Sequence, residues 1–70
     1  MTFGERLRTL RKELGIKQKD FAQALGVNSI TYGGYERNLR EPPLQMLTNL
    51  VNRYNIDVNW LLTGKNKAGE

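Results

Sequence analysis

The sequence predicts an all-α fold, a compact domain of five short helices, from three observations. Apolar residues recur every three or four positions rather than at every second one, which is the spacing of amphipathic helices. Glycine, asparagine and proline interrupt these stretches where helices would begin or end. No stretch of useful length has the alternation of a strand. With 70 residues, the chain forms one domain with a thin core.

The first predicted helix begins after Thr2, which together with Glu5 has the spacing of a capping box. Gly15 supplies a left-handed stop at its other end. Its inner face consists of apolar residues spaced i, i+4, i+7 and i+11, namely Phe3, Leu7, Leu10 and Leu14.

Two shorter helices are predicted next, at residues 17–25 and 29–37. Gly26 ends the first of them, Asn28 is a good N-cap for the second, and Asn38 tolerates the left-handed conformation that would end it. The inner residues of the first are Phe21, Ala22 and Leu25, and those of the second are Asn28, Thr31, Tyr32 and Tyr35.

The fourth helix is predicted to have Pro43 at its first position and an inner face of Leu44, Leu47, Leu50, Val51 and Tyr54. Asp57 caps a fifth helix that contains Val58, Trp60, Leu61 and Leu62, and Gly64 ends it. We therefore expect a domain at residues 1–64, followed by a polar tail or the start of a linker at 65–70.

The positive charge of the chain is concentrated in its first part. Residues 1–40 carry eight Lys and Arg against four acids, whereas residues 41–70 carry three of each, so the net charge of +4 arises entirely before residue 41. Such an asymmetry, with a pI near 9.8, is typical of a protein that binds a polyanion.

The composition argues against an enzyme. The chain contains no His and no Cys, so the most common general base, the most common metal ligand and the thiol nucleophile are all missing. We expect no metal, no cofactor and no small-molecule substrate. No apolar run could span a membrane and no secretion signal is recognisable, so we expect a soluble, cytoplasmic protein.

Residues 18–38 have the pattern of two helices joined by a short turn that contains glycine, which is the helix-turn-helix pattern. This segment, QKDFAQALGVNSITYGGYERN, resembles the helix-turn-helix of phage repressor and Cro-type (XRE-like) regulators. The segment DVNWLLTG at residues 57–64 is similar to the last helix of the same family. The resemblance implies a lambda-repressor-like fold and sequence-specific binding of double-stranded DNA.

The candidate DNA-contacting residues come from the geometry of the third helix and from this resemblance. In this docking mode the second helix of the motif enters the major groove. The residues expected to face bases are Asn28, Ser29, Ile30, Gly34 and Arg37. Two alternatives stay open: Asn28 is only an N-cap, or Ile30 is a partly buried core residue.

The residues expected to face phosphates are Lys17, Gln18, Lys19, Asn38 and Arg40, although each cation could equally be a solvated charge. The resemblance further implies a structural ion pair between Arg11 and Glu36 that joins the first and third helices.

Gly33 and Gly34 depart from the family pattern, because side-chain-bearing polar residues usually stand at these positions. One hypothesis is that they allow the backbone to approach the groove closely, with specificity arising from few side chains and from DNA shape. The other is that the helix is partly loose and orders on DNA.

The family resemblance also places a dimer contact near the last helix, with Val58, Trp60 and Leu61 as candidates, although Trp60 could instead complete the core. The function that follows is a dimeric repressor that occupies a pseudo-palindromic operator. The alternative is an antitoxin or coactivator-like subunit of the same fold that acts mainly through a protein partner.

Overall fold

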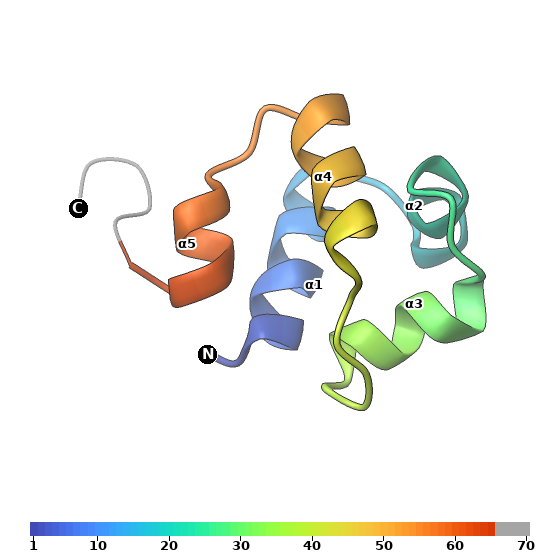
Figure 1. The fold of residues 1–70 in the computed structure, drawn as a ribbon, viewed down its shortest axis with the longest axis horizontal. Coiled ribbons are helices and arrows are strands. Elements are labelled where there is room, and N and C mark those ends of the chain that lie inside the picture. The colour runs from blue at the N-terminus through green and yellow to red at the C-terminus, as the bar shows by residue number, and fades with distance from the viewer. Residues whose placement is uncertain (66–70) are drawn as a thin grey trace.

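The computed structural model describes residues 1–65 and contains five helices in that range. They are α1 (Phe3–Glu13), α2 (Gln18–Ala24), α3 (Ser29–Glu36), α4 (Leu44–Arg53) and α5 (Val58–Thr63). Over the described range there is no strand, so the predicted all-α, five-helix fold is confirmed. Helix α1 runs through the middle, with α5 on one side and with α2 and α3 on the other (Figure 1). Most of the predicted tail, residues 66–70, lies outside the described part.

The helix ends follow the local signals in the sequence. Thr2 and Glu5 form a reciprocal capping box at the start of α1. Asn38 has a φ of 62°, so the chain turns sharply after α3. Pro43 was predicted at the first position of α4, but it is the N-cap residue, and the helix begins one residue later at Leu44.

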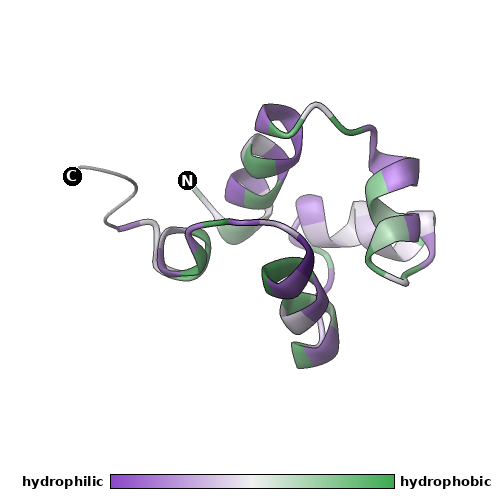
Figure 2. Ribbon diagram, turned by 90° about the horizontal axis from the view of Figure 1, so that it is seen from above, coloured by the Kyte–Doolittle hydropathy of each residue, from purple (hydrophilic) through white to green (hydrophobic). Residues whose placement is uncertain are grey.

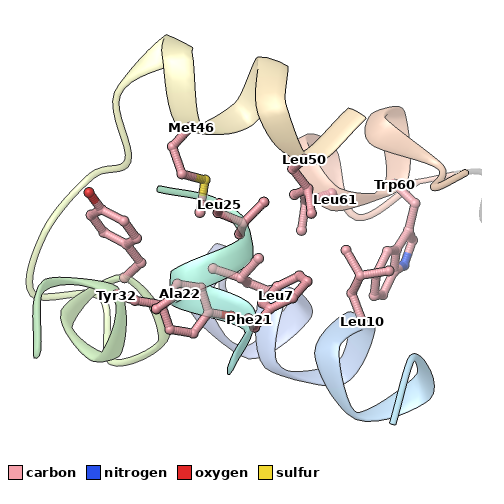
Figure 3. Close-up of a cluster of buried hydrophobic side chains, with 11 residues drawn as sticks. Leu7, Leu10, Phe21, Ala22, Leu25, Tyr32, Met46, Leu50, Trp60 and Leu61 are labelled. Carbon is pink, nitrogen blue, oxygen red and sulfur yellow. The ribbon is translucent and has the colours of Figure 1, made fainter. Parts of the chain in front are cut away.

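The core lies where α1, α2 and α3 meet α4 and α5, as Figure 3 shows. Its largest fully buried side chains are Tyr32, Phe21, Leu7, Leu25, Met46, Leu50 and Leu61. The rings of Phe21 and Tyr32 meet edge to face with centroids 5.6 Å apart, an arrangement that the aromatic quadrupole favours. This contact joins the two helices of the motif to each other.

The predicted inner face of α4 was partly wrong. Leu44 is 78% exposed and Val51 is also exposed, whereas Met46, which the prediction left out, is buried beside Leu50. Two overlapping apolar stripes run along this helix, and the core takes the one that contains Met46 and Leu50. The other stripe is left on the surface, which has consequences for assembly.

Two contacts bring α1 close to the rest of the domain. A Cβ on Gly4 would lie 2.4 Å from the backbone oxygen of Glu36, so α1 crosses the end of α3 at a distance that only glycine permits. Arg6 is buried and its Nε donates a 2.8 Å hydrogen bond to the backbone oxygen of Leu61, which ties α5 to α1.

The hydropathy of the helices separates α3 from the others. Most helices in Figure 2 carry hydrophobic residues on one side and hydrophilic ones on the other, but α3 is pale over much of its length because most of its residues lie near the middle of the hydropathy scale. Within residues 1–65, no helix combines the length and the apolar character needed to cross a membrane.

Candidate nucleic-acid interface

Helices α2 and α3 are joined by a tight turn at residues 25–28. Gly26 has a φ of +75°, which lets the chain reverse, and the backbone N–H of Val27 bonds to the backbone oxygen of Ala22 at 3.0 Å. The small side chain of Ala22 is buried beneath this turn. The two helices therefore stand in the fixed relative orientation of a helix-turn-helix.

Asn28 is the N-cap of α3, one of the two roles considered for it. Its Oδ1 accepts hydrogen bonds from the backbone N–H groups of Ile30 at 2.8 Å and Thr31 at 3.4 Å. The side chain is exposed at the start of the helix. The cap holds the first turn of α3 in place.

The outer surface of α3 presents few but exposed side chains. Ile30 is 80% exposed, which contradicts the alternative that it belongs to the core, and Ser29 and Arg37 are exposed as well. On the opposite side Tyr32 and Tyr35 are buried as predicted. Thr31 and Asn28 were also expected on that inner side, but Thr31 is only half-buried and Asn28 is exposed. An aliphatic side chain standing free in solvent is suited to contact a thymine methyl group.

Gly33 and Gly34 are both buried, although they lie on the stripe that continues from Ile30 to Arg37. A Cβ on Gly33 would be 3.5 Å from Nη1 of Arg37, and a Cβ on Gly34 would be 3.3 Å from Cδ of Arg40. The prediction that Gly34 itself faces bases is therefore corrected, because an arginine side chain covers it. The hypothesis that the glycines allow the backbone to approach the groove closely stays a prediction.

A hollow on this face joins the start of α2 to α3. Its lining consists of Gln18, Lys19, Ser29, Ile30, Gly33 and Arg37. Four predicted base- or phosphate-facing side chains besides Ile30 thus lie around one depression. A side chain at position 33 would project into it, so the glycine keeps it open.

A buried network lies directly behind this surface. Glu36 accepts from Nε of Arg11 at 2.7 Å, from Nε2 of Gln18 at 2.9 Å and from the hydroxyl of Tyr32. Arg11 and Glu36 form a buried ion pair between α1 and α3. No buried side-chain N or O atom in residues 1–65 lacks a hydrogen-bond partner, which is the condition under which a buried ion pair is tolerated.

The network sets the protonation of its members. Burial raises the pKa of Glu36, but the hydrogen bonds from Arg11, Tyr32 and Gln18 outweigh burial, so its pKa lies below the ordinary value. The hydrogen bond to Glu36 raises the pKa of Arg11 further, and burial with the hydrogen bond to Glu36 raises that of Tyr32. At neutral pH the site therefore contains a charged pair and a neutral tyrosine.

The predicted phosphate-facing residues divide into two groups. Lys17, Lys19 and Arg40 are exposed, and Gln18 reaches the surface while bonding to Glu36. Asn38 is exposed too, but its amide also has a structural role: its Oδ1 accepts from the backbone N–H of Gly4 at 2.9 Å, and its Nδ2 donates to Thr2 Oγ1 at 2.9 Å. The left-handed turn brings this amide against α1.

The predicted dimer contact is also corrected for two of its three residues. Trp60 is 8% exposed and Leu61 is fully buried, so both belong to the core, as the labelled side chains in Figure 3 show. Val58 is 37% exposed and borders an apolar hollow between α4 and α5. The exposed apolar residues around that hollow, called here the α4–α5 face, are Leu44, Val51, Val58 and Leu62.

Sequence reasoning counted Arg6 only as part of the positive charge and gave Gly4 no role of its own. In the structure, Arg6 and Arg11 are buried, so two of the eight cations in residues 1–40 serve the fold. The available signal for Gly4 was a glycine inside a helical pattern, which often marks a close approach of two backbones. In residues 1–65, no group of three His, Cys, Asp or Glu side chains is arranged to hold a metal ion.

Comparisons with known proteins agree with this geometry. A family model described as helix-turn-helix matches residues 7–61. The chain is 34% identical over its full length to the transcriptional regulator ImmR of Bacillus subtilis (strain 168), covering 54% of that protein. It is 40% identical over 62 residues, 89% of this chain and 57% of the relative, to the SPbeta prophage-derived regulator YonR of the same organism.

A third relative is the cryptic phage CTXphi transcriptional repressor RstR of Vibrio cholerae, which is 30% identical over 61 residues, 87% of this chain and 55% of the relative. The chain thus spans about half the length of the curated relatives it matches. No solved structure gives a significant match. The family model covers most of the chain, including both helices of the motif, and the chain therefore belongs to the helix-turn-helix family of phage repressor and Cro-type regulators.

Proposed function

We propose that this chain binds double-stranded DNA sequence-specifically and acts as the DNA-binding part of a transcriptional repressor. The observation that carries the proposal is the exposed start of α3, where Ser29 and Ile30 stand beside Lys19 and Arg37 around one hollow. Exposed hydroxyl and aliphatic groups can read base edges, and flanking cations can contact phosphates. In this arrangement α3 enters the major groove and the start of α2 lies along the backbone.

The proposed roles of the interface residues follow from where they lie. Ser29 and Ile30 contact base edges. Arg37, whose guanidinium group lies beside Gly33, contacts either a base or the DNA backbone. Lys17, Gln18 and Lys19 contact phosphates from the start of α2. Gln18 is held in place for this role by its bond to Glu36.

The proposed assembly is a homodimer on a pseudo-palindromic operator, with two recognition helices about 34 Å apart. The contact would involve Val58 together with its neighbours on the α4–α5 face, since Trp60 and Leu61 are occupied in the core. The exposure of four large apolar residues in one area supports this, because a second copy would remove them from water.

The same proposal implies a cytoplasmic protein that works without catalysis, metal or cofactor. The cysteine-free composition fits a reducing compartment. Repression rather than activation rests on the relatives, one of which is named as a repressor.

The test is fluorescence anisotropy of the chain on a duplex from its own promoter region and on a scrambled duplex, over about 50–200 mM salt. Tighter binding to the promoter duplex, with log affinity falling linearly with log salt, is the expected result. For the Lys19→Ala variant, the slope of log affinity against log salt should be smaller by about one, which corresponds to the loss of one phosphate contact. Arg53→Ala removes the same charge at the far end of α4 and serves as the matched control (Figure 1).

Equal and weak binding to both duplexes would contradict the proposal. It would instead favour the alternative of an antitoxin or coactivator-like subunit that acts through a protein partner. The observation in favour of that alternative is the pair of glycines, which leaves α3 with few side chains of its own on the outer face.

A further inference from the structure

Arg40 replaces, in space, the side chain that Gly34 lacks. A Cβ on Gly34 would lie 3.3 Å from Cδ, 3.4 Å from Cγ and 3.7 Å from Nε of Arg40. The aliphatic part of this arginine therefore lies along the outer stripe of α3. Because residue 34 has no side chain, an arginine from the following loop occupies the space above it.

The position of Arg40 is fixed by the backbone. After Asn38 the chain turns back, and the N–H groups of Leu39 and Arg40 both point at the backbone oxygen of Gly34, at 2.9 and 3.4 Å. The loop is thus tied to the helix at the same residue that its side chain covers.

Within residues 1–65, no hydrogen bond or ion pair engages the guanidinium group of Arg40, and the residue is exposed. The guanidinium groups of Arg6 and Arg11, in contrast, donate hydrogen bonds to acceptors inside the domain. Arg40 therefore presents a fork of five donors, held beside the recognition helix and open to a ligand.

We propose that Arg40 is a base-reading residue that recognises a guanine in the major groove, in place of a side chain from α3 itself. This rests on the proposed function, since it needs α3 to lie in the groove. A guanidinium group can donate two hydrogen bonds to O6 and N7 of guanine, a pattern that no other base presents there. Arg40 was expected to contact a phosphate, but its stem lies over Gly34, on the stripe of α3 that runs from Ile30 to Arg37.

The experiment begins with selection of binding sites for this chain from a pool of random duplexes. Relative affinities of the wild type are then measured for all single-base changes of the selected site. For Arg40→Ala, the preference for guanine at one base pair of each half-site should fall by about 5- to 150-fold, with preferences elsewhere retained. Arg53→Ala, in the last turn of α4, is the control that should retain every preference.

Replacing that guanine by 7-deazaguanine removes the N7 acceptor and nothing else in the groove. It should weaken the wild type and leave Arg40→Ala unaffected. If Arg40→Ala instead lowers affinity equally for all sequences and reduces the salt dependence, Arg40 contacts a phosphate and the assignment is overturned. That outcome leaves the proposed function standing, whereas failure to select any sequence contradicts the proposed function itself.

Two adjacent glycines supply a second test of the geometry. Gly34→Ala and Gly33→Ala add the same methyl group to the same helix, but only the first presses on Arg40, at 3.3 Å. Gly34→Ala should reduce the guanine preference, while Gly33→Ala should retain it, whatever each does to overall affinity. An undiminished preference in Gly34→Ala would overturn the assignment, because Arg40 would then not act from above residue 34.

Discussion

The side-chain amide of Gln18 donates a 2.9 Å hydrogen bond to Oε1 of Glu36, the carboxylate that Arg11 neutralises inside the domain. Gln18 opens α2 at the candidate interface, whereas Glu36 and Arg11 are buried. The first residue of α2 is therefore held by the same ion pair that joins α1 to α3. Changes to this pair are expected to affect both the stability of the domain and the surface that meets DNA.

Glu36→Gln is expected to destabilise the domain by roughly 3–5 kcal/mol, because the buried guanidinium of Arg11 loses its counter-charge. A domain of this size has a stability of about the same order, so the variant should be partly unfolded at room temperature. Urea denaturation followed by circular dichroism measures the change. Glu41→Gln, at an exposed acid, is the control, and equal urea midpoints for the two variants would contradict a structural role of the pair.

Acid should weaken the domain through the same carboxylate. The folded-state pKa of Glu36 is lowered, so its stabilisation is complete above the unfolded value of about 4.3 and is lost as the pH falls through the lowered folded value. Glu5 contributes in the same direction from the surface, because hydrogen bonds with Thr2 in the capping box lower its pKa.

The measurement is the free energy of unfolding in urea between about pH 6 and pH 3. It should be constant at the upper end and fall below about pH 4.3. Glu5→Gln should retain most of this fall. A stability that rises on acidification would show that Glu36 is not ionised in the folded domain.

Gly4→Ala should destabilise the domain by about 1–3 kcal/mol or more, since the new Cβ would lie 2.4 Å from the backbone oxygen of Glu36 and force α1 and α3 apart. This cost outweighs the gain of about 1 kcal/mol that alanine brings to a helix. Gly33→Ala makes the same change where the new Cβ would lie 3.5 Å from Nη1 of Arg37, an ordinary contact, so its stability should stay level or rise. Thermal melts of both variants measure these changes in stability. A Gly4→Ala variant more stable than the wild type would contradict the close approach of α1 to the end of α3.

The sequence predicts the helices well because their ends depend on local signals. Thr2, Asn28 and Asp57 all accept hydrogen bonds from the first turns of their helices, and residues three or fewer positions away determine this. Tertiary contacts, in contrast, do not follow from local signals. The sequence does not show which of the two apolar stripes of α4 faces the core, because Met46 and Leu44 differ in burial only through the packing of the whole domain.

The candidate site was predictable in outline but not in detail. Exposure of Ile30 followed from its angular position on α3. That Arg40 covers Gly34 could not be read from the pattern, since it depends on the path of the chain after the left-handed turn at Asn38. The inward role of the Asn38 amide has the same origin, because the turn brings it against Gly4.

Ile30→Ala should weaken binding to the operator with little effect on stability, because the side chain is almost free of contacts with the core. If Ile30 packs on a thymine methyl group, replacing that thymine by uracil should lower the affinity of the wild type by about fourfold, the value of one buried methyl group. Ile30→Ala should not respond to the same replacement. Uracil scanning of each thymine by fluorescence anisotropy makes the measurement, and a wild type insensitive to every replacement would contradict the contact.

The α4–α5 face leads to a prediction about assembly. Leu44 is largely exposed at the start of α4, so Leu44→Lys should leave the fold intact while placing a charge on the surface that a second copy would cover. Sedimentation velocity should show a dimer for the wild type and a monomer for this variant. Leu14→Lys introduces the same charge at the end of α1, away from the α4–α5 face, and should remain dimeric.

The loss of the dimer should also be visible on DNA. A dimer binds both half-sites of a pseudo-palindrome in one step, because the second contact occurs at a high effective concentration. Leu44→Lys should therefore bind one half-site and show the same affinity for a full operator as for a half operator. If Leu44→Lys sediments like the wild type and keeps its preference for the full operator, the two copies do not meet through this face. A wild type that stays monomeric both in solution and on the full operator would contradict the dimer altogether.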